Sequence, residues 1–321
     1  MENTAVLGID VSKDKLDAAL LREGKYKTRL FRNNEKGFEE LIEWMNKHTK
    51  QAIHVCLEAT GIYGEEISIY LFDKGFMVSV VNPAKIKGFA QGELARTKTD
   101  KTDAQLIARF CLAMNPAAWE PPAPEIRELK ILVRRLESLI KMKQEEDNRL
   151  SVSSEIVQGS IGRVIEILEG EIKEIREKIK NHIDNHPNLK NSKDLLETIP
   201  GVGPATIAQI LSMDCTPERF DEIKDLVAFV GLNPKHRQSG SSIQGRSRIS
   251  KTGDSTLRKA LYLPAVSAKQ HNPILKAFYE RLLAAGKPKM VAICAVMRKL
   301  LHIIYGVLKT GKAFDPNYAT T

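Results

Sequence analysis

The amino-acid sequence predicts an α/β domain followed by two helical regions. Three observations support this fold class. The first third alternates short apolar runs with helically spaced apolar residues, the middle third carries a heptad repeat, and the last third is helical around a glycine turn and one polar loop. These changes of pattern, with a proline-rich stretch at 116–124, divide the chain into an α/β domain at 1–120, a helical arm at 121–190 and a C-terminal helical domain at 191–321.

The elements of the first domain follow from the same patterns. Buried strands read as apolar runs or as apolar and polar residues in alternation, whereas helices place apolar residues on one face. Mixed strands with helical crossovers are typical of a sheet covered by helices. The predicted elements are, in chain order, strands at 5–11, 15–21 and 27–31, a helix at 36–48, a strand at 52–57, a helix at 62–72 and a strand at 77–81.

The composition favours a basic protein of the cytoplasm. The 49 lysines and arginines exceed the 40 aspartates and glutamates, for a net charge of +9, which favours nucleic acid over a membrane as partner but also fits an ordinary basic enzyme. The four cysteines are far apart in apolar contexts, which argues against a disulfide framework or a zinc cluster. Because the sequence shows neither a signal peptide nor an apolar run long enough to span a bilayer, we expect a soluble, cytoplasmic protein, associated with the nucleoid when bound to DNA.

Four carboxylates are placed where they can converge. Asp10 and Glu58 end two core strands, and the carboxyl edge of an open α/β sheet is where ligands bind. Asp100 and Asp103 lie three residues apart at the start of a helix, so they share one of its faces. Clustered carboxylates repel one another unless a hard cation neutralises them, which predicts Mg²⁺, with Mn²⁺ as an alternative. Taken singly, each residue also fits a strand-end turn or a helix cap.

Two apolar repeats follow the proline-rich stretch. The first runs over 126–140 and the second over 161–179, on either side of a polar break at 151–160. Their alternating steps of three and four residues form a heptad seam and predict a coiled-coil arm. An antiparallel pair within one chain and a dimer-forming arm both fit this seam, and the isoleucine-rich second helix favours the dimer.

A glycine turn in the last third indicates contact with a phosphodiester backbone. The segment Ile199-Pro200-Gly201-Val202-Gly203 lies between two helical patterns and is typical of a helix-hairpin-helix turn. Gly201 and Gly203 allow main-chain N–H groups at the second helix to approach a phosphate. An αα-corner with glycines for packing is the structural alternative.

The polar segment 239–251 suits the same partner. It interleaves five serines with Arg246, Arg248 and Lys251 and has few apolar residues, so we expect a surface loop or an extended strand. Hydroxyls and cations together contact phosphates, although a solvated loop explains the same composition.

Several motifs together resemble one family. They are Gly8-Ile9-Asp10-Val11-Ser12-Lys13, Glu58-Ala59-Thr60-Gly61, Asn82-Pro83 and the segment 98–104, and then the segment 199–203, Gly231-Leu232, Ser239-Gly240 and the segment 249–253 with Leu257-Arg258. In this order, over nearly the whole chain, they resemble the insertion-sequence transposases with a RuvC-like DEDD domain and a catalytic serine, which are related to Piv-type DNA invertases. Some members of that family are bridge-RNA-guided recombinases.

The resemblance implies a RuvC-like (ribonuclease H-like) fold for the first domain and a helical transposase domain at the C-terminus. It implies that Asp10, Glu58, Asp100 and Asp103 bind Mg²⁺, and that Ser239 is the nucleophile that joins covalently to a DNA phosphate. Spacing alone does not rank Ser239 above Ser241 or Ser242. The further implied partners are DNA at the element ends and target, a noncoding guide RNA, and a second copy of the chain in a homodimer that assembles to a tetramer.

We therefore expect a DNA transposase or site-specific recombinase that acts through a phosphoserine–DNA intermediate with help from Mg²⁺. A metal-dependent nuclease of the junction-resolvase type, with structural serines, is the alternative, and a non-catalytic nucleic-acid-binding protein is another. The segment 8–13 also resembles the first phosphate-binding turn of actin-like sugar kinases, but no second glycine-rich adenosine motif accompanies it.

Overall fold

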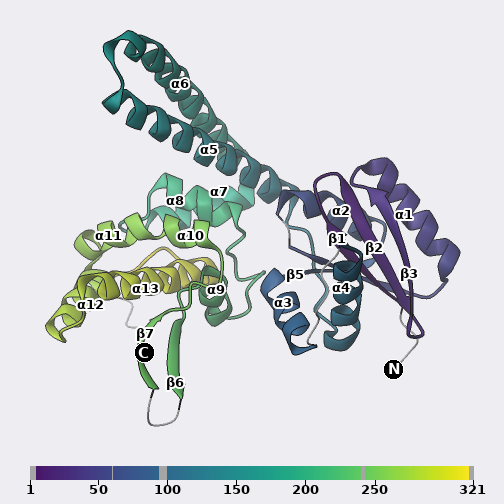
Figure 1. Ribbon diagram of the computed structural model, residues 1–321. Coiled ribbons are helices and arrows are strands. Elements are labelled where there is room, and N and C mark those ends of the chain that lie inside the picture. The colour runs from purple at the N-terminus through teal and green to yellow at the C-terminus, as the bar shows by residue number, and fades with distance from the viewer. Residues whose placement is uncertain (1–4, 60, 94–99, 240–242, 318–321) are drawn as a thin grey trace. The chain divides into compact units, whose positions relative to one another are not determined.

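A computed structural model describes the backbone of residues 5–59, 61–93, 100–239 and 243–317, and the side chains of these residues except at 100–101 and 236–248. The chain forms two compact units, Met1–Pro121 and Pro122–Thr321 (Figure 1). The division between the units falls between residues 121 and 122. The three predicted domains, with a separate arm at 121–190, stay a prediction.

The first unit is built on a five-stranded mixed sheet. Its strands are β1 (Ala5–Val11), β2 (Lys15–Arg22), β3 (Lys25–Arg32), β4 (Ile53–Glu58) and β5 (Met77–Val81), in the order β3-β2-β1-β4-β5. The first three strands form an antiparallel meander, and β4 and β5 continue from β1 in parallel. The predicted α/β class is confirmed, and the arrangement is consistent with a RuvC-like fold.

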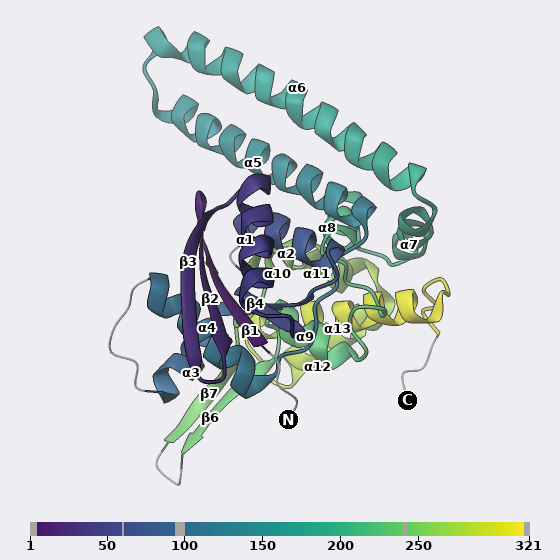
Figure 2. The same cartoon turned by 90° about the vertical axis from the view of Figure 1, so that its right-hand side faces the viewer.

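Helices cover both faces of this sheet. The core on one face joins residues of β1, β2 and β4 to α1 (Glu35–His48) and α2 (Ile62–Asp73). The core on the other face joins them to α3 (Pro83–Gly92) and α4 (Asp100–Met114). Figure 2 shows α1 against its side of the sheet. The strands carry apolar residues on both of their faces, so both faces of the sheet are covered by helices.

A long helical hairpin opens the second unit. The helices α5 (Pro124–Val152) and α6 (Glu155–Asn185) lie side by side in both views (Figures 1 and 2), and only residues 153–154 separate them. The connection is therefore much shorter than the predicted polar break at 151–160, since α6 already begins at Glu155. The seam also shifts near the middle of α5, where Leu139 is buried and Ile140 is 43% exposed.

The remaining helices of the second unit pack around one apolar core, which also holds the inner residues of α5 and α6. A short antiparallel hairpin of two strands interrupts them. In chain order the elements are α7 (Pro187–Glu197), α8 (Pro204–Ser212), α9 (Ile223–Val230), β6 (Pro234–Ser239), β7 (Ile243–Ile249), α10 (Ser255–Ala260), α11 (Tyr262–His271), α12 (Pro273–Ala284) and α13 (Lys289–Thr310).

The last helix corrects one sequence prediction. Among the described residues, α13 is a helix long and apolar enough to cross a membrane, with a mean hydropathy of 1.8. Leu300, Leu301 and Ile304 of this helix are fully buried in the core of the second unit. Its apolar composition is therefore explained by packing inside the protein.

Candidate functional site

Asp10 and Glu58 are neighbours at one edge of the sheet. The parallel strands β1 and β4 pair Gly8 with Cys56 and Ile9 with Leu57, so the next residues in register are Asp10 and Glu58. Residues side by side in a parallel pair point to the same face. The side chains at 7 and 9 enter the core beneath α1 and α2, so both carboxylates, which are half-buried, lie on the α4 face.

The start of α4 is brought to the same edge by an unusually close contact. A Cβ atom on Gly8 would lie 2.2 Å from the carbonyl O of Ala104 and 2.4 Å from the N of Ala108. Further along α4, the Cys111 thiol interacts with Cys56 and with His54, which lies two residues nearer the beginning of β4. The helix therefore runs antiparallel to β1 and β4, and its first turn faces the carboxyl edge of both strands.

The structure thus brings three of the four predicted acids to one edge. Asp103, half-buried, lies in the first turn of α4, one residue before the contact with Gly8. Asp100 is the first residue of α4, and its side chain lies outside the described residues. Among the side chains that the structure describes, no group of three or more His, Cys, Asp or Glu forms a ready metal site.

One further acid at this edge escaped sequence reasoning. The antiparallel register of β1 and β2 places Asp17 directly opposite Asp10, and opposed residues share a face. The Asp17 carboxylate is 3.4 Å from the Lys15 ammonium group. The alternation of β2 shows that Asp17 and Lys15 share a face, but only the register of the turn places that face beside Asp10.

A buried polar network holds the other end of α4. The Nε2 of His54 lies 2.8 Å from the Ser79 hydroxyl, which donates to the carbonyl O of Ala117 at 2.8 Å. Residues after α4 are thereby tied to β5. Because α4 is fixed at Gly8 and at its far end, the position of its first turn is strongly determined.

Cys56, Cys215 and the one histidine of α13 do not compete as reactive groups. The hydrogen bond to Cys111, and then burial, raise the pKa of the Cys56 thiol well above its ordinary value. Burial raises the pKa of Cys215 to about 12. Burial, and then Arg298 and Lys299, lower the pKa of His302, which therefore stays neutral.

The predicted helix-hairpin-helix turn lies between α7 and α8, and its two glycines differ. Gly201 has φ +97°, and a Cβ atom there would lie 2.8 Å from the backbone of Ala268 in α11. Gly203 has φ −101° and open space where its Cβ would be. The protein itself requires glycine at 201, whereas at 203 the missing side chain leaves room for a partner.

The serine segment forms the strands β6 and β7 and the turn between them. Ser239 is the last residue of β6 and pairs with Ile243, while Ser241 and Ser242 lie outside the described residues. Arg246 and Arg248 lie in β7, and their side chains, like that of Ser239, lie outside the described residues. The last predicted cation, Lys251, is exposed just after β7.

The base of this hairpin is clamped to the end of α9. The N–H of Ser250 donates to the carbonyl O of Asn233 at 2.7 Å, and Nη1 of Arg258 donates to the carbonyl O of Val230 at 2.8 Å. Gly231 takes φ +74° and Gly253 φ +147°, so both positions disfavour other residues. The hairpin thus emerges from a rigid base.

Comparison with known proteins agrees with these motifs. A transposase model of the DEDD type matches residues 7–152, and a model described as the transposase IS116/IS110/IS902 family matches residues 193–280. The "pilin gene-inverting protein" of Moraxella bovis is 34% identical over 312 residues, which cover 96% of this chain and 97% of the relative. The protein of the same name from Moraxella lacunata matches equally.

A weaker relative points the same way. An uncharacterized 43.6 kDa protein of the insertion element IS110 from Streptomyces coelicolor is 24% identical over 161 residues, which cover 50% of this chain and 38% of the relative. The resemblance inferred from the motifs is confirmed. The chain belongs to the IS116/IS110/IS902 family of transposases and is an enzyme of DNA recombination.

Proposed function

We propose that this transposase cuts and rejoins DNA through a covalent phosphoserine intermediate on Ser239, assisted by Mg²⁺ held at Asp10, Glu58, Asp100 and Asp103. One observation carries the metal part of this proposal: Asp10 and Glu58 share a face at the sheet edge that the first turn of α4 meets. The predicted ligands are all carboxylates, which fits a hard divalent cation better than zinc. Such an ion would lower the charge on the scissile phosphate and favour deprotonation of a nearby hydroxyl.

The serine step is a transesterification. Ser239 Oγ attacks phosphorus and loses its proton, a serine–phosphate bond forms, and the bond from phosphorus to the 3′ oxygen breaks with protonation of that oxygen. A 3′-hydroxyl of the partner strand then attacks the phosphoserine and releases the serine. Each step exchanges one phosphoester for another, so neither water nor an energy-rich cofactor is consumed. The reaction requires Ser239 and the acids to meet at one phosphate, within one chain or across two.

The remaining predicted residues contact DNA in this proposal. Arg246, Arg248 and Lys251 neutralise phosphates that flank the cleavage site. Main-chain groups at Gly201 and Gly203 bind the DNA backbone independently of its sequence. A guide RNA supplies target and donor recognition, and a dimer that pairs into a tetramer brings two strands together. The name of the Moraxella relatives, which invert a pilin gene, supports strand exchange over simple cutting.

The experiment that tests this proposal looks for a protein–DNA adduct. The full-length protein is incubated with element-end DNA, its RNA and Mg²⁺, and the adduct is mapped by mass spectrometry after nuclease digestion. We expect a phosphoserine-linked nucleotide at Ser239, and its loss in Ser239→Ala but not in Ser250→Ala, a control in the same segment. An adduct at Ser241 or Ser242 would move the nucleophile by two or three residues.

The nuclease alternative predicts a different pattern. If the enzyme uses metal alone, the Ser239→Ala variant would still cleave DNA, and no covalent adduct would form. Asp10→Asn should abolish cleavage under both readings, and chelation of the metal should do the same. Unchanged activity in Asp10→Asn would exclude the acidic edge from the chemistry.

A further inference from the structure

The edge strand β3 carries a concentration of positive charge in a unit that has no net charge as a whole. Residues 1–121 hold 17 lysines and arginines against 17 aspartates and glutamates. The eight residues of β3 (KYKTRLFR) include four cations and no acid. This charge is therefore a local feature of one strand and does not reflect a basic domain.

Three of these cations form a row on one face. Phe31 enters the core beneath α1, so residues at every second position before it, Lys25, Lys27 and Arg29, point to that same face. All three side chains are exposed, and within the described part of the chain Lys25 and Lys27 make no ion pair. The Arg29 guanidinium stacks over the Phe31 ring at 5.1 Å.

The row lies on the opposite face of the sheet from the acids. β3 is the outer strand of the sheet and pairs with β2. Its register places Leu30 opposite Asp17, which is itself opposite Asp10, so Leu30 shares the face of the carboxylates. Arg29, Lys27 and Lys25 point to the α1 face and lie progressively further from the level of the carboxylates along β3.

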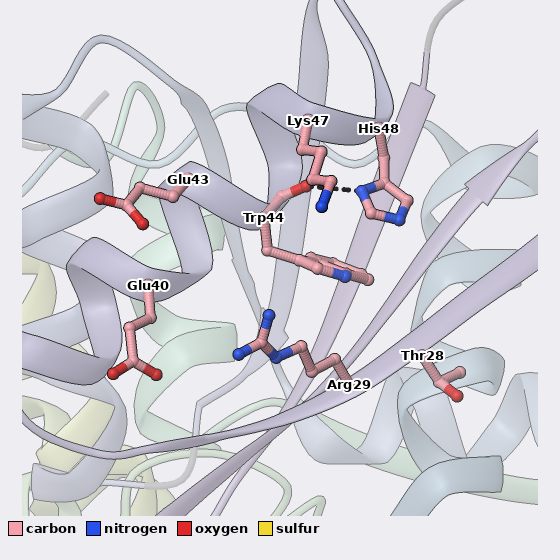
Figure 3. A pocket seen from close by; sticks show the side chains of 7 residues that line it. All are labelled: Thr28, Arg29, Glu40, Glu43, Trp44, Lys47 and His48. Carbon is pink, nitrogen blue, oxygen red and sulfur yellow. Dashed lines mark hydrogen bonds between the residues drawn. The ribbon is translucent and has the colours of Figure 1, made fainter.

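A groove beside the row restricts where a polyanion can bind. Figure 3 shows Arg29 and Thr28 of β3 on one wall and Glu40, Glu43 and Trp44 of α1 on the other, around a cavity of about 460 Å³. The two carboxylates would repel a phosphate inside the groove. A polyanion is therefore accommodated along the outer side of β3, over Lys25 and Lys27, and not between β3 and α1.

We propose that the β3 row, defined as Lys25, Lys27 and Arg29, binds the phosphodiester backbone of DNA on the face of the sheet opposite to the acids. Contacts to phosphate from a row of cations are independent of sequence and fix the register of a strand. This inference goes beyond the proposed function, because it does not depend on which residue is the nucleophile.

A structural explanation competes with this proposal. Lysines on an edge strand discourage pairing with the edge of another molecule, and for that purpose a charge of either sign suffices. Reversing the charge therefore separates the two explanations. Protection of the edge would survive Lys25→Glu with Lys27→Glu, whereas binding of DNA would not.

The experiment measures the affinity of the full-length protein for a fluorescent DNA duplex at several salt concentrations. Removing two phosphate contacts with Lys25→Gln and Lys27→Gln should lower the slope of log K against log salt by about 1.8 and weaken binding about 60-fold at 0.1 M salt. Lys25→Arg with Lys27→Arg should retain the slope. The control pair Lys50→Gln and Lys74→Gln removes two exposed lysines of the same unit that lie outside β3 and should also retain it.

Three results would overturn the proposal. The first is an unchanged salt slope in the glutamine pair, and the second is aggregation of the glutamine pair with unchanged DNA affinity in the soluble protein. The third is a loss that affects an RNA of equal length while DNA binding stays unchanged. Adduct formation at Ser239 is scored in the same variants, so failure of the DNA-binding role of the row is distinguished from failure of the serine mechanism.

Discussion

The contact between Gly8 and α4 gives a direct test of how the acidic edge is assembled. A methyl group at Gly8 would lie 2.2 Å from the carbonyl O of Ala104, whereas ordinary contacts begin at 3.4 Å, so α4 must withdraw from β1 by about 1 Å. The two obstructing atoms, the carbonyl O of Ala104 and the N of Ala108, belong to the backbone, so no side-chain rotation can relieve the contact. We therefore expect Gly8→Ala to cost about 3 kcal/mol, the upper end of the range for overpacked cores.

Both tryptophans make this cost measurable in the first unit alone. Trp44 lies in the core beneath α1 and Trp119 packs against the same core, and the chain has no others. Urea unfolding followed by tryptophan fluorescence should show a midpoint lowered by about 2 M, for a slope of about 1.5 kcal/mol per molar. Gly88→Ala is the matched control, because its Cβ would meet open space on α3, and it should be neutral or stabilising.

The reasoning is refuted if Gly8→Ala and Gly88→Ala unfold at the same urea concentration. A lowered midpoint with full recombination activity would refute a narrower point, namely that the position of α4 matters for the acids. Activity of Gly8→Ala should instead fall even under conditions in which the first unit is fully folded, because Asp100 and Asp103 move with the helix.

Three further predictions concern the second unit, and thermal unfolding checks the stability part of each. Gly201→Ala should destabilise by about 1–3 kcal/mol because of its positive φ, whereas Gly203→Ala should leave stability unchanged and weaken DNA binding. Asp254 accepts from the N–H of Leu257 at 2.7 Å and caps α10, so Asp254→Ala should cost about 1 kcal/mol, with Asp254→Asn largely restoring it. Leu139→Ala should cost about 2–5 kcal/mol, and an equal or larger cost for Ile140→Ala would contradict the shifted seam of the arm.

The sequence predicted the strands of the first unit and the helices α1, α2 and α4 closely, because each has a strong local pattern, but it did not predict α3. It also predicted that Asp10 and Glu58 end core strands. The sequence did not predict the direction of α4, because that direction depends on the contacts of Gly8 with Ala104 and of Cys111 with Cys56. Asp17 was missed for the same reason: strand alternation is local, whereas the register that sets it opposite Asp10 is fixed by the turn and by packing.

The arm and the serine hairpin show two other limits. A heptad template assigns Ile140 to the seam, but an antiparallel hairpin with a tight connection buries Leu139 in its place, because helix twist drifts against a strict seven-residue repeat. The segment 239–251 has few apolar residues, so the sequence left a surface loop and an extended strand as alternatives, and the structure shows strands. The two strands are fixed at their base, where Gly231, Gly253 and Arg258 hold the chain against α9.

If the acids at the sheet edge bind metal as proposed, the distribution of charge in the chain bears on how the enzyme binds DNA. Carboxylates that bind a metal repel the phosphates they must approach, so affinity has to come from cations placed elsewhere. Residues 122–321 hold 32 lysines and arginines against 23 acids, which accounts for the entire net charge of +9. Residues 1–121 have no net charge, and the cations of β3 lie on the opposite face of the sheet from the acids. Substitutions in the β3 row should therefore weaken DNA binding and lower its salt dependence without changing the positions of the acids.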